Sequence, residues 1–193
     1  LIGQFAGPVP TVVIAEMLGV DPDRHEQFKQ WSDLMVQVGF NPFPTEEQSR
    51  VGEEAGLALE KYLLELIAAG ADEPGEDLLG DMLRAEVEGE KLTPLEIVAQ
   101  CRLLLVAGNV TTTDLIGNGV KALLEHPEQL RKLREKPELI GNAVEEMLRY
   151  DSPVTNSGRI PNRDISIGGC PVAAGSSLST SLAAANRDPA VYP

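Results

Sequence analysis

The sequence predicts a mainly helical protein with a small β region on its C-terminal side. Through residues 1–153, apolar side chains recur at intervals of three and four, which is the spacing of amphipathic helices. Prolines at positions 22, 94, 127 and 137 stand where helices are expected to begin, and proline suits the first turn of a helix. Across residues 154–193 short apolar segments alternate with glycine turns, which is typical of strands.

The composition is that of a globular chain with a large acidic excess. Of the 193 residues 42% are hydrophobic, and 30 acidic residues against 16 basic ones give a formal net charge of −14. This charge repels phosphate backbones and argues against a nucleic-acid partner. The apolar run around 103–107 is far shorter than the ~20 residues of a membrane span, and no secretory leader is recognisable. We therefore expect a soluble, cytoplasmic protein without a membrane partner.

Shorter helices are expected ahead of residue 90. Capping residues, breaks and apolar spacing place them at residues 11–18, 22–35, 45–69 and 77–87. Pro8-Val9-Pro10 is expected to interrupt the chain ahead of the first helix, and Asn41-Pro42-Phe43-Pro44 separates the second from the third. The core side of the third helix is expected to consist of Leu57, Leu59, Leu63, Leu64 and Ile67.

The longest expected helix spans residues 94–125. Thr93 can cap it, Pro94 suits its first position, and Glu96 completes a capping box. His126-Pro127 ends it after about 30 residues, or roughly 45 Å. Two further helices are expected at residues 127–135 and 137–150.

The centre of this long helix is poor in helix-forming residues. It reads Ala107-Gly108-Asn109-Val110-Thr111-Thr112-Thr113, and Gly117 and Gly119 follow. The summed propensity cost is on the order of 5 kcal/mol, which burial must offset. Two interpretations stay open: a flat object approaches the backbone here, or neighbouring helices pack closely over the small residues. A threonine hydroxyl is also expected to bond to a carbonyl one turn earlier and open a local bulge.

Glu146 and Arg149 lie three residues apart on one face of the helix expected at 137–150. Such a pair is commonly a solvated surface contact that adds little to stability. The surrounding positions are apolar here, so partial burial is expected, and a buried pair is costly to break. These apolar neighbours are Ala143, Val144, Met147 and Leu148.

The order and spacing of these motifs resemble the cytochrome P-450 family, in particular its soluble bacterial members. The stretch 107–112 resembles the family's oxygen-activating Ala/Gly-Gly-x-Asp/Glu-Thr-Thr/Ser sequence, and Glu146-x-x-Arg149 resembles its Glu-x-x-Arg. Arg159 and the segment Asn186-Arg187-Asp188-Pro189 resemble the strands beside the haem. The resemblance implies that residues 1–193 are the interior part of a single P-450 domain that is incomplete in this chain. Residues 1–153 form its helical part and residues 154–193 its small β region.

The resemblance implies a haem cofactor and assigns roles to several residues. Thr111 is expected over the iron on the oxygen side, where it guides proton delivery, and Arg159 is expected to pair with a haem propionate. Glu146 and Arg149 are expected to be a structural pair. The residues expected to line the cofactor are Ala107, Gly108, Thr111 and Thr112. The residues expected to border the substrate pocket are Leu104, Leu105, Val154 and Thr155.

Two departures from the family pattern matter. Val110 stands where the family has an acid before its catalytic threonine, and Asp114, one turn after Thr111, is the hypothetical substitute against a plain solvated or capping role. The Phe-x-x-Gly-x-x-x-Cys-x-Gly loop that carries the iron ligand does not occur in these 193 residues. Cys101 is expected to be a small buried residue and Cys170 to lie in a hairpin, so neither is expected to bind metal. The chain is therefore expected to be an interior fragment that is inactive by itself.

The function that the resemblance implies is that of a haem-thiolate monooxygenase. Such an enzyme inserts one atom of O2 into a small apolar or aromatic substrate and takes electrons from a ferredoxin- or flavodoxin-type donor. The basic segment of Arg131, Lys132, Arg134 and Lys136 either faces that donor or is a solvated helix face. The alternative is a haem-free truncated relative that serves as a helical binding or scaffold module. A carbon monoxide difference spectrum of the reduced protein distinguishes the two.

Overall fold

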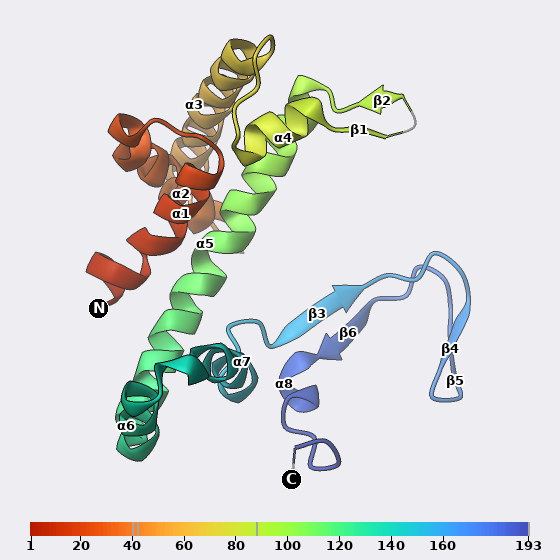
Figure 1. Cartoon of the computed structure of the whole chain (residues 1–193). Coiled ribbons are helices and arrows are strands. Elements are labelled where there is room, and N and C mark those ends of the chain that lie inside the picture. The colour runs from red at the N-terminus through yellow and green to blue at the C-terminus, as the bar shows by residue number, and fades with distance from the viewer. Residues whose placement is uncertain (40, 42, 88, 193) are drawn as a thin grey trace. The chain divides into compact units, whose positions relative to one another are not determined.

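The computed structural model (Figure 1) describes residues 1–39, 41, 43–87 and 89–192. Its backbone contacts divide the chain into two units, Leu1–Thr113 and Asp114–Pro193. The expected break at 41–44 includes Pro42, which lies outside the described residues. Across the rest of the chain the structure is mainly helical with small antiparallel strand pairs, so the predicted fold class is confirmed.

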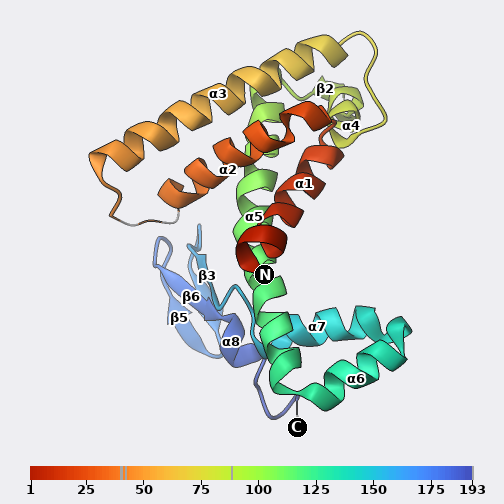
Figure 2. The same cartoon turned by 90° about the vertical axis from the view of Figure 1, so that its left-hand side faces the viewer.

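The first unit is built from helices that meet around one apolar core. Its elements are the π-helical turn η1 (Ile2–Ala6), α1 (Pro8–Met17), the 3-10 turn η2 (Pro22–Arg24), α2 (His25–Gly39), α3 (Glu46–Gly70), α4 (Leu78–Arg84), β1 (Glu86–Val87), β2 (Glu90–Lys91) and the larger part of α5 (Pro94–Glu125). Figure 2 shows α2 running alongside α3, and α1 crossing α5. The core that these helices share consists of Ala15, Leu18, Val20, Phe28, Leu59, Leu63, Ile67, Leu79, Ile97, Val98, Cys101 and Leu105.

Local capping explains where these helices begin. Thr45 and Gln48 form a reciprocal capping box at the start of α3, and the Asp77 carboxylate accepts from the backbone of Gly80 at 2.7 Å at the start of α4. Gly19, at φ 71°, follows the end of the first helix, where glycine adopts this left-handed conformation without strain. These contacts place α3 and α4 so that their apolar sides reach the core.

Three expectations about the first unit were wrong in detail. Pro8 begins α1 instead of interrupting the chain, because proline has no amide hydrogen to lose in the first turn of a helix. The short helix ends at Arg84, because residues 86–87 pair with residues 90–91 through a turn at Gly89, φ 86°. Leu57 is 60% exposed, since it lies on the side of α3 away from the buried Leu59 and Leu63.

The helix α5 covers residues 94–125, the range expected for the longest helix. It contains an 18-residue window of mean hydropathy 1.2, which is long and apolar enough to cross a membrane by length and composition alone. The sequence did not indicate this property, because the uninterrupted apolar run around 103–107 is much shorter than the window. The window is 28% buried, and α5 supplies Ile97, Val98, Cys101 and Leu105 to the core of the first unit.

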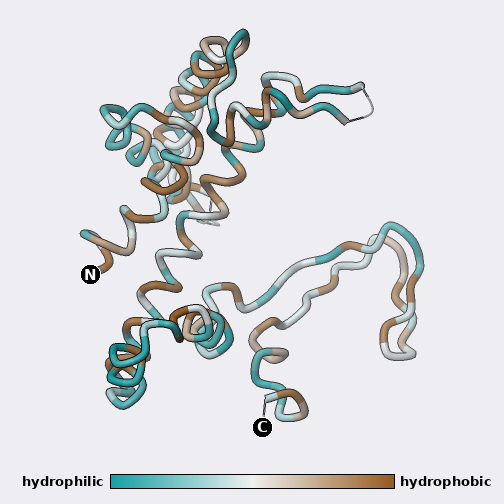
Figure 3. Tube along the Cα trace, in the orientation of Figure 1, coloured by the Kyte–Doolittle hydropathy of each residue, from teal (hydrophilic) through white to brown (hydrophobic). Residues whose placement is uncertain are grey.

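In the part of the second unit that the structure describes, the end of α5 is followed by three α-helices, one 3-10 turn and two strand pairs. Its elements are α6 (Pro127–Glu135), the 3-10 turn η3 (Pro137–Leu139), α7 (Ile140–Tyr150), β3 (Asn156–Arg159), β4 (Ile165–Ile167), β5 (Cys170–Val172), β6 (Leu178–Ser181) and α8 (Leu182–Ala185). The tube in Figure 3 is largely hydrophilic along α6 and more mixed along α7.

The β region confirms one expected hairpin and adds a pairing that the sequence did not indicate. β4 and β5 pair through Gly168 and Gly169, whose φ values of 57° and 84° suit a tight two-residue turn. β3 pairs antiparallel with β6, so that Arg159 lies opposite Leu178. β6 ends at Ser181, because the Ser181 side chain caps α8.

Candidate functional site

The buried side of α5 ends in a polar residue. Asn109 is 5% exposed and follows Leu105 by one turn on the same side of the helix. Its Nδ2 donates to the Oγ of Ser32 in α2, which is fully buried, at 2.8 Å. One turn further along, the Thr113 hydroxyl donates to the backbone carbonyl of Ala6 at 3.1 Å. Polar contacts therefore hold this side of α5 to α2 and η1.

Two glycines of α5 lie against neighbouring helices. A Cβ atom at Gly108 would come 2.7 Å from Cδ1 of Ile14 in α1, and one at Gly119 would come 2.5 Å from Sδ of Met147 in α7. At these positions small residues let the side chains of neighbouring helices come close to α5, which agrees with the second of the two interpretations left open by the sequence. Gly108 has no side chain, so any other group that approaches α5 at this position contacts only its backbone.

The opposite side of α5 is open at Ala107 and Thr111. Ala107 is exposed, and Thr111 and Thr112 are partly exposed. The Thr111 hydroxyl donates to the carbonyl of Ala107 at 2.7 Å, so the expected bond to the preceding turn is confirmed. The expected bulge does not form, because α5 is α-helical at every position from Pro94 to Glu125.

The two leucines expected at the substrate pocket lie on different sides of α5. Leu104 is 40% exposed and lies one turn before Ala107 on the open side. Leu105 is fully buried within the core of the first unit. Its side chain has no surface left for a ligand. Asp114 is exposed, one turn after Thr111.

Glu146 and Arg149 form a bidentate ion pair on α7. Arg149 Nε donates to Glu146 Oε2 at 2.7 Å, and its Nη2 donates to Oε1 at 2.6 Å. The Arg149 side chain is 25% exposed and that of Glu146 58%, so the expected partial burial holds for the arginine. The hydrogen bonds from Arg149 hold the pKa of the Glu146 carboxyl below its usual value, and those to Glu146 raise the pKa of Arg149.

The segment after α8 closes the carboxyl end of α7. Arg149 Nη1 donates to the carbonyl of Asn186 at 2.9 Å, and Asn186 Nδ2 donates to the carbonyl of Leu148 at 3.4 Å. Arg187 Nη2 donates to the carbonyl of Tyr150 at 2.8 Å. The last carbonyls of a helix have no partner within it, and side chains of residues 186 and 187 supply that partner here. This role was not recognised in the sequence, because nothing in residues 186–189 indicates which helix they meet.

The remaining predicted site residues lie on exposed backbone. Val154 and Thr155 are exposed ahead of β3, and Val154 is 39% exposed. Arg159, at the end of β3, is exposed, and its Nη1 donates to the Oγ of Ser157 at 2.5 Å. Its other guanidinium nitrogens are therefore available to an anionic group.

The cysteines occupy contrasting environments. Cys101 is 1% exposed in the core, where burial raises the pKa of its thiol to about 11. Cys170 is exposed at the start of β5. Across the described residues, no group of three or more His, Cys, Asp or Glu side chains is placed to hold a metal ion.

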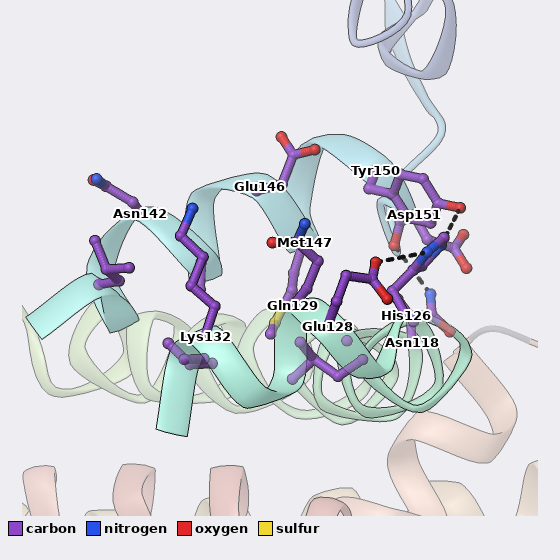
Figure 4. Close-up of a pocket in the computed structure, with 16 residues that line it drawn as sticks. Asn118, His126, Glu128, Gln129, Lys132, Asn142, Glu146, Met147, Tyr150 and Asp151 are labelled. Atoms are coloured by element: carbon purple, nitrogen blue, oxygen red, sulfur yellow. Dashed lines mark hydrogen bonds and ion pairs between the residues drawn. The ribbon is translucent and has the colours of Figure 1, made fainter. Parts of the chain in front are cut away.

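A cavity of about 490 Å³ lies in the second unit between the end of α5, α6 and α7 (Figure 4). Met147 and Lys132 line it, and His126 Nε2 lies 3.4 Å from the Tyr150 hydroxyl at one end. Glu146 also lines it, so the acidic member of the structural pair borders this cavity. The sequence did not single out the cavity, because its walls come from helix faces whose spacing is that of ordinary packing.

Comparisons with known proteins match the chain to one family. The model of the family described as Cytochrome P450 matches residues 29–193. Cytochrome P450 107B1 of Saccharopolyspora erythraea is 42% identical over 189 residues, which cover 97% of this chain and 45% of that protein. The Vitamin D(3) 25-hydroxylase of Pseudonocardia autotrophica is 40% identical over 190 residues, which cover 97% of this chain and 45% of that protein.

A solved structure gives the same match in three dimensions. The crystal structure of CYP109E1 from Bacillus megaterium in complex with corticosterone superposes with a TM-score of 0.90 at 37% identity. The match covers 99% of this chain and 51% of that chain. The chain spans about half the length of the relatives it matches.

Proposed function

Since the chain belongs to the cytochrome P450 family, we propose that it supplies the oxygen-side helix and the structural pair of a haem-thiolate monooxygenase. This enzyme inserts one atom of O2 into a small organic substrate. The observation that carries the proposal is the open side of α5, where Thr111 is bonded to the carbonyl of Ala107 in a stretch that matches the family's oxygen-activating sequence. Residues 1–193 then belong to one P450 domain, as an interior part of it.

The residues of this chain fit a flat, largely apolar cofactor. Ala107 presents a single methyl group between Leu104 and Thr111, so an object can come close to α5 at this point. Ala107, Thr112 and the backbone of Gly108 would line the haem. Arg159 would pair with a propionate, since an exposed guanidinium forms strong charge-assisted bonds to a carboxylate. When bound, the haem supplies oxygen activation and transfer of one oxygen atom to the substrate.

Thr111 has a defined part in moving protons. Its single hydroxyl hydrogen is engaged by the Ala107 carbonyl, so its lone pairs remain to accept a hydrogen bond from water. Thr111 can thus hold a water molecule on the oxygen side. Val110 has no ionisable group, and the exposed carboxylate of Asp114, one turn after Thr111, is the group proposed to pass protons from solvent toward Thr111. Leu104, on the open side of α5, is the residue of the first unit that is proposed to border the substrate, and Val154 and Thr155 are the residues proposed for this role in the second unit.

The substrate is a small apolar molecule, and steroids are among the compounds that fit this description. Support comes from the names of two relatives, a vitamin D(3) 25-hydroxylase and a structure in complex with corticosterone. Electrons come from an acidic ferredoxin- or flavodoxin-type donor. Arg131, Lys132 and Arg134 are exposed along α6 and form a basic surface in an acidic protein, which suits such a donor. The protein acts as a soluble enzyme of the cytoplasm, in keeping with its bacterial relatives.

The test begins with haem binding. Because residues 1–193 contain no iron-ligating cysteine loop, the test uses these residues within a full-length protein that carries this loop, and its reduced, haem-loaded form is expected to give a red-shifted carbon monoxide difference band. A colourless protein without this band supports the haem-free scaffold alternative instead and overturns the proposal.

The second step of the test separates Thr111 from Asp114. Thr111→Ala is expected to lower product formation by about 10²-fold, with the reducing equivalents lost as peroxide, whereas Thr111→Ser retains most activity. Asp114→Asn is expected to lower turnover, whereas Glu90→Gln, an exposed acid of β2, leaves it unchanged. Unchanged turnover and coupling in Asp114→Asn would remove Asp114 from the proton path.

A further inference from the structure

A polar clamp holds the otherwise apolar core side of α5. Ile97, Cys101 and Leu105 follow one another at intervals of four residues, and all are at most 1% exposed. The next position in this stripe is Asn109, and the one after it is Thr113. These two residues replace apolar packing by directional bonds to Ser32 and to the carbonyl of Ala6.

The geometry of a helix places Thr111 opposite this clamp. Successive residues turn by about 100°, so Asn109 and Thr113 share one side and Thr111 lies about 200° from each of them. In the sequence, Thr111 lies midway between Asn109 and Thr113, which make the two hydrogen bonds. On the helix, it lies on the side opposite to these two residues. Any rotation of α5 that breaks the bonds at Asn109 and Thr113 must also turn Thr111 away from the open side.

The two hydrogen bonds of the clamp lie in the part of α5 where the residues have a weak preference for helix. Gly108 and the β-branched residues 110–113 give this turn a weak preference for helix, so its rotation is poorly fixed by local propensity. Apolar contacts such as that of Gly108 with Ile14 are non-directional and tolerate small rotations. A hydrogen bond of 2.8 Å between two buried side chains tolerates much less.

We propose that Ser32, Asn109 and Thr113 are positioning residues that fix the rotation of α5 and thereby hold Thr111 on the oxygen side. The inference rests on the proposed function, because it assigns these residues to the reaction in which Thr111 takes part. It also links α2 to the reaction, since Ser32 is contributed by that helix.

The test replaces both partners of the buried bond in the haem-loaded protein. The double variant Ser32→Ala/Asn109→Leu leaves no unsatisfied polar group, so its thermal stability is expected to stay close to that of the parent protein. Amide hydrogen exchange across residues 107–113 is expected to accelerate about tenfold, because the turn loses its directional contacts. The share of reducing equivalents released as peroxide is expected to rise at least about threefold, because Thr111 is no longer held in its catalytic position.

Matched variants separate positioning from a general loss of stability. Ile67→Val removes one methyl group from the same core without touching the clamp, and it is expected to change neither exchange at 107–113 nor leakage. Thr113→Val should reproduce the double variant and Thr113→Ser should restore the parent behaviour, which keeps the test decisive if the double variant fails to fold. Exchange and leakage equal to those of Ile67→Val would overturn the inference. A full-length protein that carries the cysteine loop and still binds no haem refutes the proposed function, whereas hydrogen exchange still reports on the clamp.

Discussion

Arg149 holds Glu146 through two nitrogens and still reaches the carbonyl of Asn186 with a third. Arg50 in α3 makes the same bidentate contact with Glu47, but its remaining nitrogen pairs with Glu54 in the same helix. Both arginines therefore bind a glutamate three residues earlier in the same bidentate way. Arg149 also binds a residue that is distant in the sequence, whereas Arg50 binds only neighbours on its own exposed helix.

Replacing each of these arginines by lysine is expected to have different effects. Arg149→Lys keeps the charge but cannot bind Glu146 and Asn186 together, so the melting temperature should fall by about 2–5 °C. Arg50→Lys should change it by less than about 1 °C, because exposed pairs add little. Differential scanning calorimetry measures both. Equal shifts would show that the bond to Asn186 contributes nothing.

The Glu146–Arg149 pair predicts a loss of stability in acid. In the folded protein the hydrogen bonds from Arg149 hold the pKa of Glu146 below its usual value of 4.5. The unfolded chain binds the proton more readily, so the pair stabilises the fold above pH 4.5 and this contribution is lost as the pH falls through the lowered pKa. Urea unfolding of the parent and of Glu146→Gln, at about pH 6 and pH 3, checks this. The difference in unfolding free energy between the two proteins should shrink at the lower pH.

Two glycines in helices are expected to respond to alanine in opposite ways. A Cβ at Gly80 would lie 2.0 Å from the carbonyl oxygen of Gly75, so Gly80→Ala must displace backbone and should cost at least about 3 kcal/mol. Gly141 in α7 has open space around the same position, so Gly141→Ala should add about 0.5 kcal/mol through helix propensity. Chemical denaturation measures both changes. A stable Gly80→Ala variant would show that the loop at 75 can move aside.

The two thiols are expected to differ in reactivity. Cys101 is buried and its pKa is raised to about 11, so almost no thiolate is present near neutral pH, whereas Cys170 is exposed. A chromogenic disulfide reagent should therefore modify Cys170 alone in the folded protein and both thiols after unfolding. Fast modification of Cys101 in the native state would mean that the core around α5 opens readily.

Helices with strong terminal signals could be predicted from the sequence, and short strands could not. Pro94 and Pro127 mark the first residues of α5 and α6 because proline fits the first turn of a helix. The strand at 156–159 contains Asn, Ser and Gly, which carry no strand signal, and it forms because β6 pairs with it from 19 to 25 residues further along the chain. Pairing at that distance depends on tertiary structure.

The candidate site divides in a similar way. Thr111 and its bond to Ala107 follow from the local chemistry of a threonine in a helix, so the sequence could indicate them. The role of Asn109 could not be inferred, because a buried amide needs a partner and Ser32 lies 77 residues away. The burial of Leu105 beside the exposed Leu104 likewise depends on which side of α5 meets the other helices.

The closure of α7 by residues 186 and 187 has a consequence during protein synthesis. The carbonyls of Leu148 and Tyr150 leave the ribosome 37 or 38 residues ahead of the side chains that bind them. At the usual rate of translation this interval lasts roughly 2–7 s, during which water must solvate the end of the helix. The nascent chain therefore carries α7 with a frayed end, and its last turn becomes fixed only when Asn186 and Arg187 have been added and the intervening hairpins have folded back.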